Sequence, residues 1–281
     1  MFQRLQDSWE LVKQSMAVLR ADKELVVFPI MAAIASMLVF MTFLIPMALT
    51  GAGEAMLAEE GTNIVGLIVM FLFYVASYFV ALFANSALVG AALIRLRGGD
   101  PTVADGLRIA REHIVQILGY AVIAATVGIV LRMISERSGA LGRVVVGIIG
   151  MAWSLATFLV VPILVVEDVG PIEAVQRSGA LLKKTWGEQV AGNFSIGLVF
   201  GLAMFVAFLL FIPLFFIAGS MESVGLFIGL IILAVLVMLC LGLLSSTLSG
   251  IYAAAVYQYV TTGDSGDFFD VKMIKSSFRP K

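Results

Sequence analysis

Residues 154–186 read SLATFLVVPILVVEDVGPIEAVQRSGALLKKTW, and this stretch decides how the chain is organised. The part before Glu167 is uncharged and consists mainly of Leu, Val, Ile and Phe, which are among the residues least costly to place in lipid hydrocarbon. Pro171 suits the first turn of a new helix, where a backbone N–H has no intrahelical partner to lose. The apolar residues of this second helix recur three, four or seven positions apart: Ile172, Val175, Leu182 and Trp186. The stretch predicts a membrane span that ends at Glu167 and Asp168, followed by an amphipathic surface helix.

The composition places the chain among polytopic membrane proteins. Of its 281 residues, 61% are hydrophobic and 13% are charged, about half the charged fraction of soluble domains. The net charge of -1 gives no support for nucleic-acid binding. Cys240 is the single cysteine, so no internal disulfide can form, and its apolar surroundings suit a small buried hydrophobe. We expect no cofactor, no metal and no nucleic-acid partner.

Long uncharged runs predict the spans. Residues 25–53 and 61–94 carry no charge and exceed the ~20 residues that cross a bilayer. We predict an all-α bundle in a single transmembrane domain, with spans at about 25–50, 64–94, 114–131, 144–166, 190–217 and 224–258. The uncharged run 223–263 is too long for one crossing, so the helix either breaks near residues 245–250 or continues into the cytoplasm. A seventh span is the weaker alternative.

Three surface helices, at about 2–20, 101–112 and 171–186, and a polar tail, 264–281, complete the prediction. The first helix has an apolar stripe of Phe2, Leu5, Trp9, Val12, Met16 and Leu19, and it either lies on the membrane or caps the bundle. Asp100 and Pro101 suit the N-cap and first position of the second helix. The ends of spans two and six share a pattern in which Ser86 corresponds to Ser246, and the two proline helices share another. Together they suggest three units, each a surface helix and a hairpin, starting near residues 2, 100 and 170.

Two segments resemble a known family. Pro162, Glu167-Asp168, Gly170-Pro171 and Arg177-Ser178, together with SWELVKQSMAVLRADKELVVFPI at residues 8–30, resemble uncharacterised six-helix membrane proteins of bacteria. More distantly, the chain is similar to the multi-pass membrane domain of some glycerophosphodiester phosphodiesterases. In those enzymes the chemistry belongs to a separate soluble domain, so the resemblance implies a membrane fold and no activity.

The distribution of Lys and Arg predicts the orientation. The N-terminal segment, the loops at 95–113 and 167–189 and the tail carry fifteen of these residues, and the other three loops carry three. By the positive-inside rule, both termini then lie in the cytoplasm of a bacterium, and the chain spans its inner membrane. The basic residues of the surface helices would meet anionic lipid headgroups, which we expect as partners beside the bilayer itself.

The candidate site residues fall into two groups. Pro162, Glu167, Asp168, Pro171 and Arg177 form a structural junction, in which Arg177 is expected to pair with the Glu167 carboxylate at the end of a span. Polar residues inside the spans could line a solute path, although such residues more often bond between helices: Asn85, Ser86, Asn193, Ser245, Ser246, Thr247 and Ser249.

The spans carry no ionisable group in their interiors, which disfavours an ion-coupled transporter. We therefore expect a non-enzymatic membrane scaffold, or a component that acts through lipids, further copies of the chain or other membrane proteins. The main alternative is a permease or channel for a small uncharged or apolar solute. A weaker alternative is an intramembrane enzyme that acts on lipids.

Overall fold

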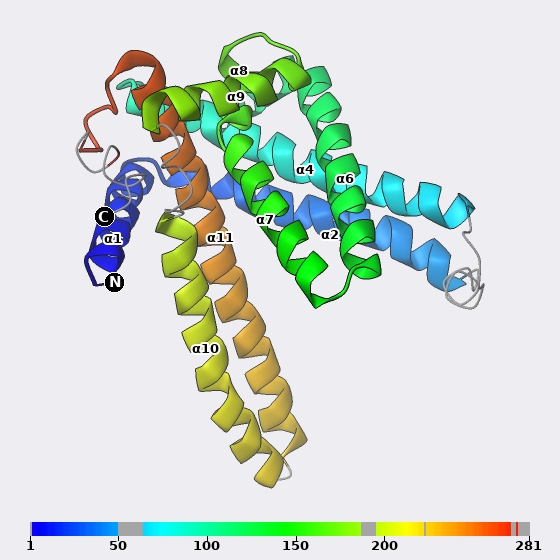
Figure 1. Cartoon of the computed structure of the whole chain (residues 1–281). Coiled ribbons are helices and arrows are strands. Elements are labelled where there is room, and N and C mark those ends of the chain that lie inside the picture. The colour runs from blue at the N-terminus through cyan, green and yellow to red at the C-terminus, as the bar shows by residue number, and fades with distance from the viewer. Residues whose placement is uncertain (1, 50–63, 187–194, 222, 271–273, 275–281) are drawn as a thin grey trace.

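The computed structural model of the chain describes residues 2–49, 64–186, 195–221, 223–270 and 274 (Figure 1). In this part of the chain every regular element is a helix. The elements are α1 (Phe2–Ala21), η1 (Lys23–Val26), α2 (Val27–Leu49), α4 (Ile64–Leu96), α5 (Val103–Glu112), α6 (Ile114–Arg137), α7 (Ala140–Ala156), α8 (Val160–Val166), α9 (Pro171–Trp186), α10 (Ser195–Ser220) and α11 (Val224–Thr262).

Within the described residues, six helical stretches are long and apolar enough to cross a membrane, the number that the sequence predicts. They are Lys23–Leu49, Ile64–Leu96, Ile114–Arg137, Ala140–Val166, Val199–Ser220 and Val224–Thr262. The third continues past residue 131, because Arg132 and Glu136 pair at 2.7 Å along the same helix instead of ending it. The sixth is unbroken through residues 245–250 and stops at Gly263, whose φ of 79° suits glycine. Residues 190–194 of the expected fifth span lie outside the described residues.

Helices α4, α8 and α11 contact one another at the centre of the fold. Their buried residues lie mainly within 84–96, 160–165 and 247–258. Leu88, Ile163 and Ile251 are each at most 1% exposed. Close packing of large apolar side chains holds protein interiors together, so these three segments form the core of the described part of the chain. We call this region the packed end.

Three helix pairs extend from the packed end. The pair α2 with α4 runs to the right in Figure 1, whereas α6 with α7 and α10 with α11 run toward its lower edge. Away from the packed end, large apolar side chains such as Leu72, Leu210 and Leu236 are 51%, 63% and 51% exposed. Apolar side chains that cover whole helices without a protein partner fit a hydrocarbon environment. The pairs therefore present lipid-facing surfaces, whereas the packed end is held together by protein contacts.

The helices that begin the three predicted units, α1, α5 and α9, surround the packed end. Each of them packs mainly on the helix pair of another unit. Helix α5 packs on α4, α9 packs on α8 and α7, and α1 packs on α10 and α11. In the order of the three predicted units, each short helix therefore contacts the pair that precedes it, and α1 contacts the last pair. This arrangement joins the three helix pairs into a closed ring of contacts.

The buried face of α1 includes Val12 and Leu19 of the expected apolar stripe, each 5% exposed, but it is centred on other residues. Ser8, Leu11, Ser15 and Val18 are at most 4% exposed, whereas Trp9 is 53% exposed. Serine side chains are small, so the helix can approach α10 and α11 closely through this face. Helix α1 therefore caps the bundle with one face and leaves Trp9 outside. The side chains of Phe2 and Leu5 lie outside the described residues.

Helix α5 begins two residues later than expected, and its N-cap is Thr102 instead of Asp100. Thr102 and Asp105 form a reciprocal capping box, and Glu24 Oε2 accepts the Val103 N–H at 3.0 Å, so three N–H groups of the first turn are satisfied. The hydrogen bonds from Thr102 also hold the pKa of Asp105 below its ordinary value of 3.8. This cap ties α5 to η1 and fixes the helix over α4.

Gly106 allows the close approach of α5 to the packed end. A Cβ atom at this position would overlap the Phe28 ring and lie 2.7 Å from the carbonyl oxygen of Ala87 on α4. Only glycine fits this contact without moving the backbone. Gly179, in the equivalent helix α9, has no atom within 4 Å of its ideal Cβ position.

Candidate functional site

The fourth span is broken at residues 157–159, a feature that the expected continuous span 144–166 did not include. Pro162 lacks an N–H, and its ring would clash with the carbonyl group of Phe158 in a continuous helix. Helix α7 therefore ends at Ala156 and α8 begins at Val160, so that Pro162 lies in the first turn of α8. The break sets α8 in the packed end and α7 outside it.

Ser178 of α9 satisfies the backbone that this break exposes. Its Oγ accepts the N–H of Leu159 at 3.1 Å, and Ser178 is 0% exposed. Ala174, Ser178 and Leu182 are all buried and lie four residues apart on one face, whereas Ile172 of the predicted stripe is 66% exposed. Small side chains at Ala174 and Ser178 let α9 lie against α8. The spacing of these small residues is the signal in the sequence that could have identified this face.

Glu167, Arg177 and Tyr257 form what we call the Glu167 cluster. Arg177 Nε donates to Glu167 Oε2 at 2.9 Å, which is the pairing expected from the sequence. The Tyr257 hydroxyl donates to Glu167 Oε1 at 3.1 Å. The Glu167 side chain is 20% exposed and that of Arg177 is 52% exposed, while Tyr257 is 3% exposed. One carboxylate therefore joins the end of α8 to both α9 and α11.

The structure places the other junction residues beside this cluster. Pro171 is the first residue of α9 and lies over α6, where a Cβ at Gly119 would be 3.0 Å from the Pro171 ring. Asp168 is exposed and lies between the two helices. Tyr257 is the member of the cluster that the sequence did not reveal, because it lies 90 residues from Glu167 in an uninterrupted apolar helix.

Of the polar residues expected inside the spans, Asn85 meets the α11 backbone, and Ser86 and Thr247 are buried on α4 and α11. Ser86 and Thr247 are 0% exposed, and Thr247 Oγ1 donates to the carbonyl of Leu243 at 2.8 Å. A Cβ at Gly250 would lie 3.1 Å from Asn85 Oδ1, so this amide is packed against the α11 backbone. Ser245 and Ser249 are half-buried, Ser246 is exposed, and Asn193 lies outside the described residues.

The buried carboxyl group of Asp22 lies where α1 meets the first span. Asp22 is 5% exposed, and its Oδ1 accepts the N–H of Glu24 at 3.3 Å. Burial raises the pKa of the Asp22 carboxyl above 3.8, although the Glu24 N–H and the Arg95 guanidinium oppose the rise. Arg95 also donates to the carbonyl oxygens of Ala21 and Gly99 at 3.4 and 3.2 Å. These contacts hold the ends of α1 and α4 together.

Within the described residues, no group of three or more His, Cys, Asp or Glu side chains could hold a metal ion. The polar groups that come together instead connect helices: Ser178 connects α9 to the break, and Glu167 connects α8 to α9 and α11. The candidate site is therefore a polar junction at the packed end of the fold.

Six long apolar helices in the described part of the chain define a polytopic α-helical membrane protein. Residues 64–269 match the model of a family of unknown function, DUF6159, and the chain belongs to this family. The matched segment begins with α4 and includes the whole Glu167 cluster. No curated protein and no solved structure matches the chain. The family agrees with the resemblance to uncharacterised membrane proteins, and the more distant resemblance to phosphodiesterase membrane domains has no support from these comparisons.

Proposed function

We propose that the protein is a non-enzymatic scaffold of the bacterial inner membrane that acts through contacts with lipids and membrane proteins, further copies of the chain included. The main support is that polar groups inside the packed end form hydrogen bonds that connect helices. Ser178 satisfies the backbone of the broken span, and Glu167 is bonded by two helices at 2.9 and 3.1 Å. These groups are engaged in holding the fold together, which is the role that a scaffold requires.

The spans offer no group for coupling transport to protons. The interiors of the six spans, residues 25–53, 64–94, 114–131, 144–166, 195–221 and 223–263, contain no Asp, Glu, Lys, Arg or His. Proton-driven carriers use buried groups of these types, which change protonation where the substrate binds. His113, the one histidine, lies between α5 and α6 with its Nδ1 2.9 Å from the carbonyl oxygen of Ile109. This position at a helix end supports a local structural role for His113.

One observation favours the alternative, a permease for a small neutral solute. The Oγ atom of Ser86 is buried on α4, and the described residues offer it no hydrogen-bond partner. A buried hydroxyl without a partner costs about 1–3 kcal/mol, and a solute that accepted its hydrogen bond would recover part of that cost. Asn85 is packed against the α11 backbone and Thr247 is fully buried, so neither is open to a solute. These two residues therefore favour the scaffold over the permease.

Liposomes that contain the purified protein test the proposal. We expect no proton flux above empty liposomes under an imposed pH gradient or voltage, and no faster swelling in glycerol or urea. His113→Ala should leave both measurements unchanged. Solute entry without proton flux would instead establish the permease, and proton flux that His113→Ala abolishes would establish a coupled carrier.

We also propose that the packed end and both termini face the cytoplasm, as the positive-inside rule indicates. In a Cys240→Ser background, a cysteine at Ser138 should react with an impermeant maleimide in intact cells, and one at Gln176 should react only after permeabilisation. Gln176 is suitable because it is exposed on α9, whereas a cysteine at the neighbouring Ser178 would be buried and unreactive from either side. The opposite labelling pattern would reverse the orientation.

A further inference from the structure

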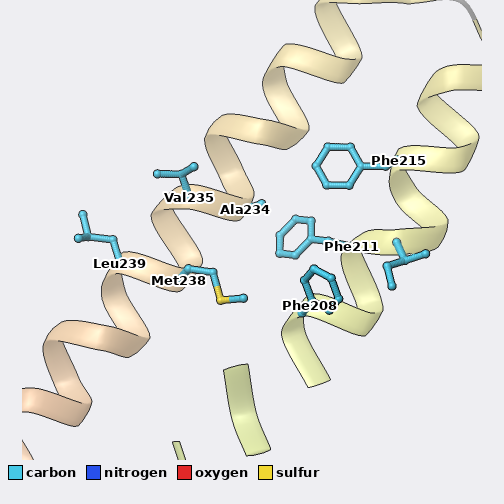
Figure 2. Close-up of a pocket in the computed structure, with 8 residues that line it drawn as sticks. Phe208, Phe211, Phe215, Ala234, Val235, Met238 and Leu239 are labelled. Atoms are coloured by element: carbon cyan, nitrogen blue, oxygen red, sulfur yellow. The ribbon is translucent and has the colours of Figure 1, made fainter. Parts of the chain in front are cut away.

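The α10–α11 pair contains an apolar groove between its two helices (Figure 2). The volume of the groove is about 480 Å³. Three rings of α10, Phe208, Phe211 and Phe215, lie along the side that faces α11, and Ala234 and Met238 are among the α11 residues opposite them. Each of the residues that line the groove has an apolar side chain, so the groove offers no side-chain hydrogen bond to an occupant.

The groove lies deep in the predicted membrane. Ala234 is ten residues from Val224, which begins α11, and at 1.5 Å per residue this places it about 15 Å along the helix. This is about half of the ~30 Å hydrocarbon thickness. Phe208 is at the middle of α10, and Phe215 lies five residues before the helix ends at Ser220. The medium around the groove is therefore hydrocarbon, because lipid headgroups and water lie at the ends of these helices.

The size of the groove decides between two apolar occupants, a transmembrane helix of a second copy and a hydrocarbon chain. From Phe208 to Phe215 it runs about 10 Å along α10, and a transmembrane helix with its side chains is about 10–12 Å wide. A helix of that width would occupy roughly 800 Å³ over this length, which is more than the 480 Å³ of the groove, so a helix of a second copy does not fit inside it. A flexible hydrocarbon chain is narrower and can follow the space beside the rings. The aromatic pair Phe215–Phe227, with ring centroids 5.4 Å apart, joins the two helices at the end of the groove nearer to the turn.

We propose that this groove binds a segment of one phospholipid acyl chain. Its lining buries methylene groups of the chain against aromatic rings, and Ala234 leaves the room that a larger side chain would fill. Because the site lies near the middle of the bilayer, it binds the distal part of the chain, and the headgroup plays little part in recognition. This site does not depend on the scaffold proposal, since a permease could contain it equally well.

Spin-labelled lipids test the proposal with the full chain in vesicles of phosphatidylcholine. A nitroxide near the end of the acyl chain should show a motionally restricted population with the native protein. Ala234→Phe should remove about one restricted chain per protein, and Met238→Phe should do the same. Leu236→Phe is the matched control, because Leu236 is 51% exposed on α11 and does not line the groove. Circular dichroism and gel filtration would show that the variants fold.

Three results would overturn the proposal. Equal restricted populations in all four proteins would mean that the groove holds no chain. Restriction that requires an anionic headgroup would place the contact at the membrane surface. A loss of restriction that accompanies conversion of a dimer to a monomer would mean that a second copy covers the groove. Loss in both groove variants with unchanged size, and no loss in Leu236→Phe, would support the acyl-chain site.

Discussion

Gly106→Ala is expected to lower the free energy of unfolding in detergent by about 2 kcal/mol. The added methyl would overlap the Phe28 ring and lie 2.7 Å from the backbone oxygen of Ala87, which cannot move without disturbing α4. Overpacking of this kind costs roughly 1–3 kcal/mol and more where backbone is involved. The higher helix propensity of alanine returns about 1 kcal/mol, so the clash outweighs the gain. Titration of helical ellipticity with SDS would measure the change.

Gly179→Ala is the matched control, because it makes the same substitution in α9 at a position with no atom within 4 Å. Here only the propensity effect remains, and we expect a gain of about 1 kcal/mol. Opposite signs for the two variants would confirm that α5 packs on α4 through Gly106. A stabilising effect of Gly106→Ala would mean that α5 lies farther from α4 than the structure places it.

Glu167→Ala is expected to destabilise the protein by about 2 kcal/mol. The larger part comes from the buried Tyr257 hydroxyl, which loses its acceptor at a cost of about 1–3 kcal/mol. The pair with the half-exposed Arg177 adds only ~0–1 kcal/mol. Tyr257→Phe should cost about 1 kcal/mol, and the double variant should cost less than the sum of the two, because both changes remove the same hydrogen bond. The same SDS titration would provide the four values.

Glu136→Ala serves as the control for a surface ion pair, since Glu136 pairs with Arg132 within α6 and both side chains are more than half exposed. Its loss should cost about 0.3–0.5 kcal/mol. If Glu167→Ala had no larger effect than Glu136→Ala, the Glu167 cluster would not hold the helices together. Loss of a cellular phenotype with unchanged stability would point to a chemical role for the carboxylate.

Uncharged runs in the sequence predict which segments form membrane helices, but they carry little information on which helices touch. Leu88 and Leu72 lie on the same helix, yet one is 1% exposed and the other is 51% exposed. In lipid, both the protein-facing and the lipid-facing sides of a helix are apolar, so hydrophobic periodicity does not separate them. The central contact of α4, α8 and α11 could therefore not be predicted from the sequence.

The candidate site was predictable where partners lie close in the chain. Glu167 and Arg177 are ten residues apart, and an acidic group at a helix C-terminus calls for a nearby cation. Tyr257 is brought to Glu167 only by the packing of α11, and Ser178 meets Leu159 only because the fourth span breaks. Ser86 and Ser246 occupy similar places in the sequence repeat, but Ser86 is buried and Ser246 is exposed. Sequence similarity between the units therefore does not fix their contacts.

The ring of contacts around the packed end has a consequence for biosynthesis. Helix α1 is synthesised first, but its partners α10 and α11 are synthesised last. About 200 residues separate α1 from these partners. At a synthesis rate of about 5–20 residues per second, this separation means a delay on the order of 10–40 s. During that time the apolar face that contains Leu11 and Val18 has not met its final partners, and it is open to the membrane surface or to a chaperone. Docking of α1 therefore reports that the last helix pair has been inserted.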